Sequence, residues 1–428
     1  MSRQNLVFNS AELPTPFDYD LLFKNLPKLI DSTPKTGRRP FSKNALLRSL
    51  IYKSLRRLAT LSDLNFELNN NPSISHALGF NPIGSAPSIE RFSSFLHDTP
   101  NILLQKIRHQ IILELIRTDV ITGSTIAADS CPLVVQLKEN NLKTAMYSNR
   151  FDKTRIPKGD PDARLGVLMQ YLSPGKKQVR FFWGYRNHVI IDTTSELPIA
   201  EMTQPANLQE VKVVKPLLEE LKKMFNLPFQ YVIADASYDW EEFLKFIIND
   251  LKAYPIIPHN PRRTTSSFGI KKSKIICDAG LPMYRKGNMR NKPNGIVYCQ
   301  YSCPIIYDKK FQHQYITCPI FHPKFFKGKG CNVLIRLEPS IRAQIDYGTQ
   351  KFKKIYNSRS SVERIFSRLL SIAMQNPTVK GLMAIKNHAT IAHITVLLIA
   401  MVAAKTGQKD KIRFIKSFVP NFMYENII

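Results

Sequence analysis

Two short segments of this chain each place a carboxylate after an apolar run. TIAADS (125–130) carries Asp129, and YVIADASYDW (231–240) carries Asp235. One Asp after a strand is ordinary turn chemistry, because Asp caps loops and helix starts, but two near-copies indicate a shared role. If the two strands are neighbours, both carboxylates emerge at one sheet edge, where they repel each other unless a cation lies between them. Carboxylate oxygens suit Mg²⁺ or Mn²⁺, so the pair predicts a divalent metal site.

A third acid, Glu363, lies in the segment KIYNSRSSVERIFSRLLSIA (354–373). The spacing of three and four residues predicts a helix that carries Tyr356, Arg359 and Glu363 on one face. Beside that face runs an apolar stripe of Ile355, Val362, Phe366 and Leu369. Arg and Glu four residues apart are also typical of a surface ion pair worth about 0.3 to 0.5 kcal/mol. By itself, the pair therefore predicts no site.

The elements that must position these acids alternate between strands and helices from residue 124 onward. Apolar runs bounded by the turns SPGKK and TTSE predict antiparallel hairpins. The strands expected are STIAAD, RLGVLMQYL, VRFFWGYRNHVIID, LPIAEMT and LPFQYVIAD. A helix is expected before the last of them, with Asn207 as its N-cap, Glu210 as the capping-box partner and Pro216 as a kink or a later start. DWEEFLKFIIND predicts the next helix.

The first hundred or so residues are predicted to be helical. KNALLRSLIYKSLRRL forms a basic amphipathic helix, TLSDLNFEL follows with Ser62 as a candidate cap, and PSIERFSSFL opens at Pro87 and Ser88. Three short helices with tight breaks suit a helix-turn-helix DNA reader, although plain helical bundles with basic faces have the same pattern.

The most apolar run is IAHITVLLIAMVAA, residues 391–404. Its length is short for a bilayer, so it predicts a buried core helix and no membrane association. The segment MSRQNLVFNS has no secretory signal pattern.

The charge of the chain points to a polyanionic partner. The 428 residues carry a formal net charge of +28, which favours nucleic acid over a merely soluble basic protein. The span Lys252–Arg342 holds 17 Lys or Arg residues and only three acids. Aromatic residues interleave with these charges, as on a surface that follows a phosphate backbone, whereas a plain solvated loop needs none. They are Tyr284, Tyr298, Tyr301, Phe311, Tyr315, Phe325 and Phe326, and the patches GIVYCQY and QYITCPI predict strands.

Five of the six cysteines lie in this basic span, between residues 277 and 331. In a cytoplasmic protein such clustering favours a metal site, or no special role, over disulfides. Cys299 and Cys303 are four apart, Cys318 and Cys331 follow, and two histidines lie between them. This predicts a structural Zn²⁺ site that stabilises a subdomain with little core, the alternative being buried free thiols in a β-rich insertion.

Other titratable residues are assigned to structure. Asp239 is expected to cap a helix that starts near Trp240, Asp162 to lie in a loop, and Asp192 to belong to a hairpin turn. A single histidine on a strand, His188, is more often packed than a ligand.

The order and spacing of these motifs resemble the DDE transposases of bacterial insertion sequences, which have an RNase H-like, retroviral-integrase-like catalytic domain. That family has a Tyr-x2-Arg-x3-Glu-x6-Lys signature around its last acid. The chain supplies Tyr356, Arg359 and Glu363 at that spacing and has Leu370 at the Lys position. Similar segments are DPDARLG, GYRNHVIIDTTSELPIAEMTQPAN, IADASYDW and, near the N-terminus, GRRPFSKNALLRSLIYKSL.

The resemblance implies a catalytic triad of Asp129, Asp235 and Glu363 that binds Mg²⁺ or Mn²⁺ and cuts phosphodiester bonds by two-metal catalysis. The residues expected to contact DNA come from the signature helix and the basic span: Tyr356, Arg359, Arg364, Arg368, Lys271 and Lys272. The implied substrates are double-stranded terminal inverted repeats and target DNA, to which 3′-hydroxyls are joined. A homodimer on DNA is expected, as is a cytoplasmic, nucleoid-associated location in a bacterium.

The predicted fold is α/β, with an RNase H-like mixed sheet flanked by helices, an N-terminal helical domain and a β-rich basic insertion before the last catalytic helix. The segments expected are 1–120 (helical, DNA-binding), 121–258 (first part of the catalytic core), 259–350 (basic, Cys-containing insertion) and 351–428 (last part of the core). Two alternatives stay open: a catalytically decayed, domesticated DNA-binding protein, and an RNase H-like nuclease without strand transfer.

Overall fold

The computed structural model describes residues 19–31, 40–81, 84–141, 151–173, 176–260, 270–271, 274–290, 297–336 and 341–415. The chain divides into two compact units. Unit 1 comprises residues 1–238, 247–257 and 350–428, and unit 2 comprises residues 239–246 and 258–349. Most of the basic span therefore belongs to unit 2.

The N-terminal part of unit 1 is helical, as predicted. Its helices are α1 (Tyr19–Lys24), α2 (Lys43–Leu55), α3 (Leu61–Asn70), α4 (Pro72–Leu78), α5 (Ile89–Asp98) and α6 (Asn101–Arg117). The expected cap Ser62 is wrong: Thr60 caps α3 and forms a capping box with Asp63. That pair satisfies two free backbone N–H groups at once, which Ser62 inside the helix cannot do.

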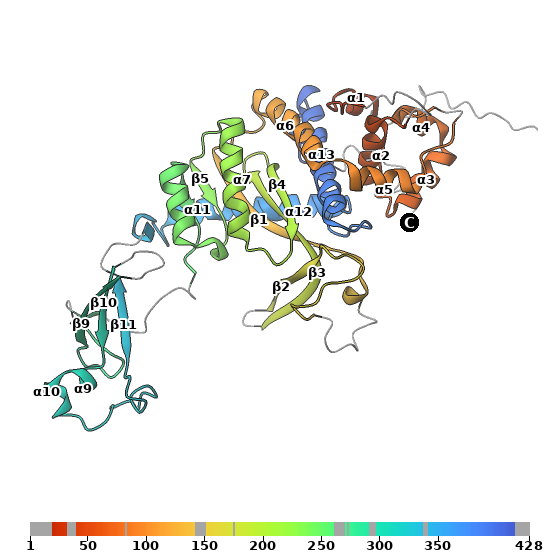
Figure 1. Cartoon of the computed structure of the whole chain (residues 1–428). Coiled ribbons are helices and arrows are strands. Elements are labelled where there is room, and N and C mark those ends of the chain that lie inside the picture. Colours follow the sequence, from red (N-terminus) through yellow and green to blue (C-terminus); the bar gives the residue numbers. More distant parts are fainter. Residues whose placement is uncertain are drawn as a thin grey trace, which may run out of the picture. The chain divides into compact units, whose positions relative to one another are not determined.

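A mixed sheet of six strands forms the centre of unit 1 (Figure 1). Its strands are β1 (Thr125–Val134), β2 (Arg164–Ser173), β3 (Lys176–Asp192), β4 (Leu197–Pro205), β5 (Tyr231–Ile233) and β6 (Tyr254–Ile256). β3 pairs antiparallel with β1, β2 and β4, while β1, β5 and β6 run parallel. The predicted RNase H-like mixed sheet is confirmed.

Helices cover both faces of this sheet. In Figure 1, α7 (Glu210–Phe225) lies in front of the sheet and α12 (Ser360–Ser371) lies behind it. α7 packs on β1, β3 and β4, and α12 packs on β1. Each helix buries an apolar stripe, because hydrophobic side chains recur at helical spacing. The stripes are Val213, Val214, Leu217, Leu218 and Leu221 on α7, and Val362, Ile365 and Leu369 on α12.

The long helix α13 (Leu382–Lys405) packs against α2, α5, α6 and β4. By length and composition it is apolar enough to cross a membrane, but 89% of its most apolar window is buried inside the protein. The expected core helix is confirmed. The α13 residue His393 contacts the side-chain oxygen of Asn187 on β3 through its ring nitrogen Nε2, at 2.9 Å.

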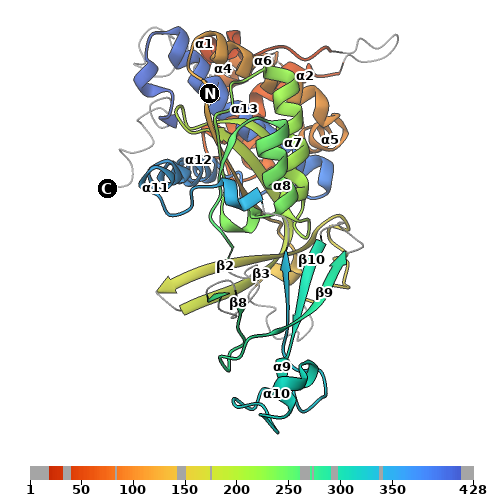
Figure 2. The same ribbon diagram turned by 90° about the vertical axis from the view of Figure 1, so that its left-hand side faces the viewer.

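Unit 2 contains a three-stranded antiparallel sheet in the order β11-β10-β9 (Figure 2). Its elements are β7 (Ile270–Lys271), β8 (Lys274–Ile275), β9 (Tyr284–Arg290), β10 (Val297–Ser302), α9 (Pro304–Tyr307), α10 (Lys309–Gln312) and β11 (Asn332–Arg336). GIVYCQY supplies β10 as expected. QYITCPI is not a strand, because its backbone turns back on itself: Tyr315 N–H donates to Phe311 O and Phe321 N–H donates to Cys318 O.

Asp239 does not cap the following helix, which corrects the sequence-based assignment. Helix α8 (Glu241–Lys245) has Trp240 at its N-cap position without a side-chain cap. The fully buried Asp239 carboxylate instead accepts hydrogen bonds from Arg342 Nε at 2.8 Å and from the backbone N–H of Asn260 at 2.9 Å. It therefore joins distant parts of unit 2.

Candidate active site

Asp129 and Asp235 lie at matching positions on neighbouring parallel strands. The parallel ladder of β1 and β5 ends with the pair Ala127 and Ile233, and each Asp lies two residues further on. The predicted adjacency of the two strands is confirmed. β1 does not end at Asp129, however, because its antiparallel ladder with β3 continues to Val134.

Glu363 lies in the first turn of α12. The single helix expected around it is wrong: α11 (Gln350–Tyr356) and α12 are joined by a 3-10 turn, Asn357–Arg359. The turn keeps Arg359 and Glu363 in contact, with 2.8 Å between Arg359 Nη1 and Glu363 Oε1. The same guanidinium lies 3.4 Å from Asp129 Oδ2 through Nη2. Arg359 therefore bridges the carboxylates of β1 and α12.

Asp129 is in an environment that disfavours its charged form. Burial raises the pKa of its carboxyl to about 7, and the nearby carboxylates of Asp235 and Glu210 raise it as well. Arg359 and the Ser130 N–H, which donates to Asp129 Oδ1 at 2.8 Å, act in the opposite direction. Desolvation and like charge thus outweigh the one guanidinium at this position.

Asp235 follows β5 and is held by the next turn. Its Oδ1 accepts hydrogen bonds from the Ser237 N–H at 2.8 Å and from the Ser237 hydroxyl at 2.5 Å. The ring of Tyr238 is fully buried beside these acids. Burial raises the pKa of Tyr238 well above its ordinary value, and Glu210, Asp129 and Asp235 raise it further. Three carboxylates therefore lie within electrostatic reach of one phenol.

Glu210 is a fourth acid at this site, although its spacing from Asn207 predicted a role in helix capping instead. α7 has Gln209 at its N-cap and no capping side chain. Glu210 Oε1 accepts hydrogen bonds from the Ser130 hydroxyl at 2.6 Å and from Arg186 Nη1 at 3.0 Å, and its Oε2 accepts one from the Ser237 hydroxyl at 3.0 Å. The sequence carries one hint of this role of Glu210. A serine follows the Asp in both ADS and ADAS, and these two serines are the hydroxyl partners of Glu210.

The remaining signature residues have varied surroundings. Tyr356 ends α11 and stacks on Phe352 with 6.3 Å between ring centroids. Burial raises the pKa of Tyr356, opposed by Arg359 and reinforced by the acids around it. Leu370, at the position of the family's Lys, is exposed.

Arg364 and Arg368 are both bound to one acid of the same unit. Arg364 Nε lies 2.9 Å from Glu196 Oε1, and Arg368 Nη2 lies 3.2 Å from Glu196 Oε2. Burial lowers the pKa of Arg368 to about 10, against the opposing effect of Glu196. Of the two, only Arg364 is half exposed, at 52% of its side chain. Arg368 is therefore poorly placed to meet a phosphate.

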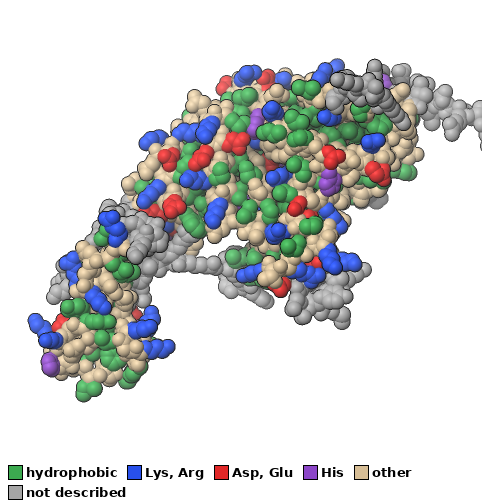
Figure 3. Space-filling model, viewed as in Figure 1, with side chains coloured by type: hydrophobic (Ala, Val, Ile, Leu, Met, Phe, Trp, Pro, Cys, Tyr) green, Lys and Arg blue, Asp and Glu red, His purple; other side chains and the backbone are tan. Residues whose placement is uncertain are grey.

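The expected DNA-contacting lysines belong to unit 2. Lys271 ends the short strand β7, and Lys272 lies outside the described residues. Figure 3 shows Lys and Arg side chains over the visible face of this unit, with few acids among them. Lys286 lies over the ring of Tyr307 at 4.3 Å, and Tyr284 stacks on that ring. One cation and two aromatic rings thus lie together on this surface.

The thiols expected to bind zinc do not all meet. Cys303, Cys318 and Cys331 line one small cavity, and the fourth cysteine there is Cys277. Cys299 lies on β10 instead, where its sulfur accepts a hydrogen bond from Arg285 Nε at 3.1 Å. The Cys-x3-Cys spacing fails as a guide because Cys299 is inside a strand and Cys303 lies beyond its end.

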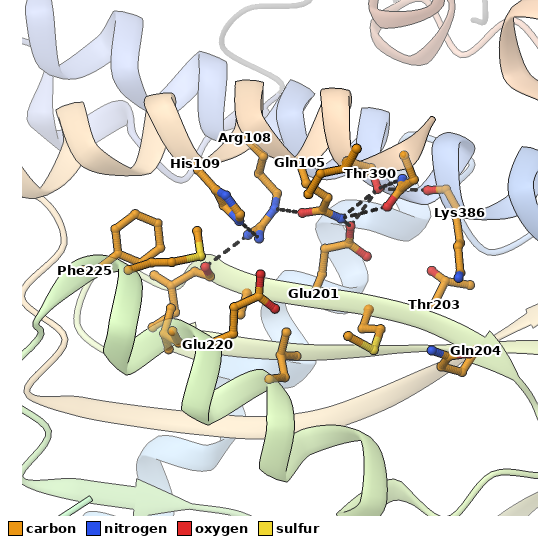
Figure 4. A pocket seen from close by; sticks show the side chains of 18 residues that line it. Gln105, Arg108, His109, Glu201, Thr203, Gln204, Glu220, Phe225, Lys386 and Thr390 are labelled. Atoms are coloured by element: carbon orange, nitrogen blue, oxygen red, sulfur yellow. Dashed lines mark hydrogen bonds between the residues drawn. The ribbon is translucent and has the colours of Figure 1, made fainter. Parts of the chain in front are cut away.

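A second polar region of unit 1 lines a cavity of about 230 Å³ between α6, α7, β4 and α13 (Figure 4). Here the Gln105 amide lies between Arg108 and Glu201: its oxygen accepts a hydrogen bond from Arg108 Nε at 2.7 Å, and its nitrogen donates to Glu201 Oε1. Thr390 donates to the same Glu201 oxygen at 2.7 Å, and Asn187 donates to the other at 2.7 Å. Both carboxylate oxygens of Glu201 therefore have hydrogen-bond donors from the protein itself.

The acids around Arg359 have the donor chemistry of a hard divalent cation, because all their ligand atoms are carboxylate oxygens. Within the described ranges, no three His, Cys, Asp or Glu side chains already stand in the arrangement of a metal site. The guanidinium of Arg359 occupies the space between Asp129 and Glu363. The residues therefore fit a divalent cation if Arg359 moves aside as the cation enters.

Comparisons with known proteins give one family. Residues 150–398 match the model of the transposase DDE domain, a range that includes Asp235 and Glu363. No curated protein matches the chain. Among solved structures, the chain is similar to piggyBac transposase in a synaptic complex with hairpin DNA, determined by cryo-EM. The identity is 12% and the TM-score 0.38, over 96% of this chain and 82% of that one.

Proposed function

The chain belongs to the family of transposases with a DDE domain, and on this basis we propose that Asp129, Asp235 and Glu363 are its catalytic acids. The protein would bind the terminal inverted repeats of an element of the bacterial insertion-sequence type. It would cut phosphodiester bonds at the element ends and join the 3′-hydroxyls to target DNA. Because two ends must be handled together, it would act as a homodimer on DNA.

One observation supports this proposal most directly. Arg359 contacts the carboxylates of Asp129 on β1 and of Glu363 on α12, and the carboxylate of Asp235, in the turn after β5, acts on the same guanidinium electrostatically. A surface ion pair alone requires only one acid. A buried carboxylate whose pKa is raised to about 7 by burial, with like charges adding to the shift, is typical of a functional site rather than of a stabilising one.

The three carboxylates would hold a divalent cation, Mg²⁺ or Mn²⁺. When bound, such ions supply a deprotonated attacking oxygen and stabilise the charge on the leaving oxygen. The chain's own contribution is to fix the ligands. Ser130 N–H orients Asp129, and the Ser237 N–H and hydroxyl orient Asp235. Both motif copies thus use a following serine for the same purpose.

Glu210 would act as a positioning residue. It accepts hydrogen bonds from the hydroxyls of Ser130 and Ser237, which stand beside the two Asp residues, and it is neutralised by Arg186 at 3.0 Å. The carboxylate therefore ties the middle of β1 to the turn after β5. This arrangement keeps the two Asp residues in register without requiring Glu210 to touch DNA or metal.

Unit 2 would contribute DNA affinity through its basic surface. Replacing the exposed Lys309 and Lys310 of α10 with Ala should reduce the slope of log affinity against log salt by about 0.9 for each phosphate that is no longer neutralised. Fluorescence anisotropy with duplex DNA at several salt concentrations measures that slope. The double Ala variant of Lys212 and Lys223, exposed on α7 in unit 1, is the control. An unchanged slope in the α10 variant would remove α10 from the interface.

The deciding experiment is cleavage of linear DNA that carries the end of the encoding element, with Mg²⁺, Mn²⁺ or EDTA. Glu363→Gln should abolish metal-dependent cutting, while Glu242→Gln, an exposed Glu of α8, should cut like the wild type. Binding without cutting in either metal would point to a decayed DNA-binding protein. Cutting without joined products on a target plasmid would point to a nuclease without strand transfer.

A further inference from the structure

Four of the six cysteines converge in unit 2, although they come from four separate segments. None of the six forms a disulfide. The cavity they line also includes His322. Cys277 follows β8, and Cys303 precedes α9. Cys318 follows α10, and Cys331 precedes β11.

The sulfur atoms of this cluster are in direct contact. The Cys331 thiol is hydrogen-bonded to both Cys277 and Cys303. Around a tetrahedral zinc ion with Zn–S distances of about 2.3 Å, neighbouring sulfurs lie about 3.8 Å apart, which is close to the separation in an S–H···S contact. The three thiols therefore belong to one group of interacting sulfurs, as a shared ion requires.

The backbone around two of the cysteines forms matching turns. Gly280 N–H donates to Cys277 O at 2.8 Å, and Phe321 N–H donates to Cys318 O at 2.9 Å. The donor residue is left-handed in both turns, with φ of +80° at Gly280 and +50° at Phe321. That conformation is costly for a bulky residue such as Phe, so the surroundings of Cys318 must enforce it.

The turn after β8 is closed by a second backbone hydrogen bond. Cys277 N–H donates to Leu281 O at 2.9 Å. Together with the bond from Gly280 N–H to Cys277 O at 2.8 Å, it fixes the backbone conformation at Cys277.

Gly330 permits the close approach of Cys331 to Cys303. Its φ is +59°, and a Cβ there would lie 2.4 Å from the Cβ of Cys303 and 3.2 Å from its sulfur. Any other residue at position 330 would therefore push Cys331 away from Cys303. The sequence has a glycine where the cluster needs the backbone to pass closely.

The segment between these cysteines has little else to hold it. Residues 313–331 form no helix or strand, and several of their apolar side chains are exposed instead of forming a core. Ile316 is 100% exposed, Phe321 68% and Phe326 64%. A small region without a core commonly depends on a metal ion or disulfides for its stability.

We propose that the four thiolates of the cavity bind one structural zinc ion: Cys277, Cys303, Cys318 and Cys331. In the described parts of the chain these side chains do not yet stand in a metal arrangement, and the Cys331 thiol is hydrogen-bonded to Cys277 and Cys303. Rotation of the thiols towards the common centre exchanges those bonds for Zn–S bonds and releases the thiol protons to solvent. The ion then ties the segment 313–331 to the turn after β8.

The test is the zinc content of the full chain, purified without a metal-affinity step and measured by plasma mass spectrometry. We expect about one zinc per chain, with tetrahedral sulfur coordination in X-ray absorption. Ser substitution at any of the four cysteines should lower the content at least about fivefold. Cys299→Ser is the matched control and should retain zinc, because Cys299 lies on β10 outside the cavity. His322→Ala should also retain it.

A second measurement uses only the wild-type protein and Cys299→Ser, so it decides the question even where Ser variants of the four cavity cysteines fail to fold. Titrating the wild-type protein with a mercurial thiol reagent should release one zinc, detected with a chromogenic chelator, and Cys299→Ser should release the same amount. A strong zinc chelator should make the segment 313–331 sensitive to protease. Absence of zinc with no uptake from added zinc, or loss of zinc in Cys299→Ser alone, would overturn the proposal. So would a disulfide between any two of the four cysteines.

Discussion

Asp129 and Glu201 are two carboxylates on the same rung of one sheet. Each pairs across the ladder with Val189, Asp129 from β1 and Glu201 from β4. Directly opposite residues of antiparallel strands point to the same face, so both acids are directed to the same side of the sheet. Their surroundings differ. Glu201 accepts hydrogen bonds from Gln105, Thr390 and Asn187, whereas Asp129 has the Ser130 N–H and the bridging Arg359.

The difference separates a structural carboxylate from a candidate catalytic one. The donors to Glu201 come from α6, α13 and β3, so this acid joins the N-terminal helices to the sheet. Asp129 has other carboxylates as neighbours, and burial with their repulsion raises its pKa to about 7. A buried carboxylate that the protein has fully paired stabilises the fold. One left with excess negative charge around it can accept a cation.

The largest expected contrast is in DNA cleavage. Asp235→Asn should lower the rate by at least about 10³-fold, since members of one catalytic unit fail together. Glu201→Gln should cut at the wild-type rate per folded molecule, because Glu201 belongs to the network around Gln105. Single-turnover cleavage at equal concentrations of folded protein measures both. Equal losses of cleavage in the two variants would show that Glu201 matters to the reaction as much as Asp235 does.

The next effect is on stability. Glu201→Ala should lower the free energy of unfolding by about 3 kcal/mol, because the buried donors of Asn187 and Thr390 lose their acceptor. Urea unfolding followed by circular dichroism reports the change. Glu242→Ala, at an exposed position, should alter the free energy by less than about 0.5 kcal/mol. A Glu201→Ala protein as stable as the control would show that the network contributes nothing to the fold.

Asp129→Asn should raise the free energy of unfolding, whereas Glu201→Ala should lower it. The pKa of folded Asp129 is raised from 3.8 to about 7, so its ionisation destabilises the wild type progressively as pH rises from about 4 to about 7. In EDTA the variant should be more stable than the wild type at pH 8, by on the order of 1 kcal/mol. The gain should shrink towards zero near pH 4. Urea unfolding at several pH values tests this, and a variant less stable at pH 8 would make Asp129 a structural acid.

The smallest expected effect is on how far Mg²⁺ raises the melting temperature of Arg359→Ala. Without its guanidinium, Asp129 and Glu363 lose their cation, so Mg²⁺ should raise the melting temperature of Arg359→Ala more than that of the wild type, by roughly 2 °C. Differential scanning fluorimetry with Mg²⁺ or EDTA measures the difference. Arg364→Ala, whose partner is Glu196, serves as the control and should match the wild type. Identical Mg²⁺ shifts in all three proteins would show that Arg359 does not compete with the metal for the carboxylates of Asp129 and Glu363.

The sequence determined most of the elements and indicated the candidate acids. Apolar runs bounded by turn residues predicted the strands of the sheet, because a short buried strand shows itself as such a run and needs no tertiary information. The repeat of ADS and ADAS identified Asp129 and Asp235, and their strands are indeed neighbours. The apolar stretch at 391–404 predicted a core helix, and α13 is buried. These are local patterns that one segment carries by itself.

Tertiary structure decided which distant groups meet. Glu210 fits a capping box by spacing, yet the packing of α7 on β1 and β3 gives it Ser130 and Arg186 as partners. Cys277, 54 residues before Cys331 in the sequence, joins the thiol cluster, while Cys299 does not. Hydrogen bonds and ion pairs act over a few ångströms in space, and chain separation does not encode that distance. The sequence therefore determined the local elements, and only the fold selected the partners.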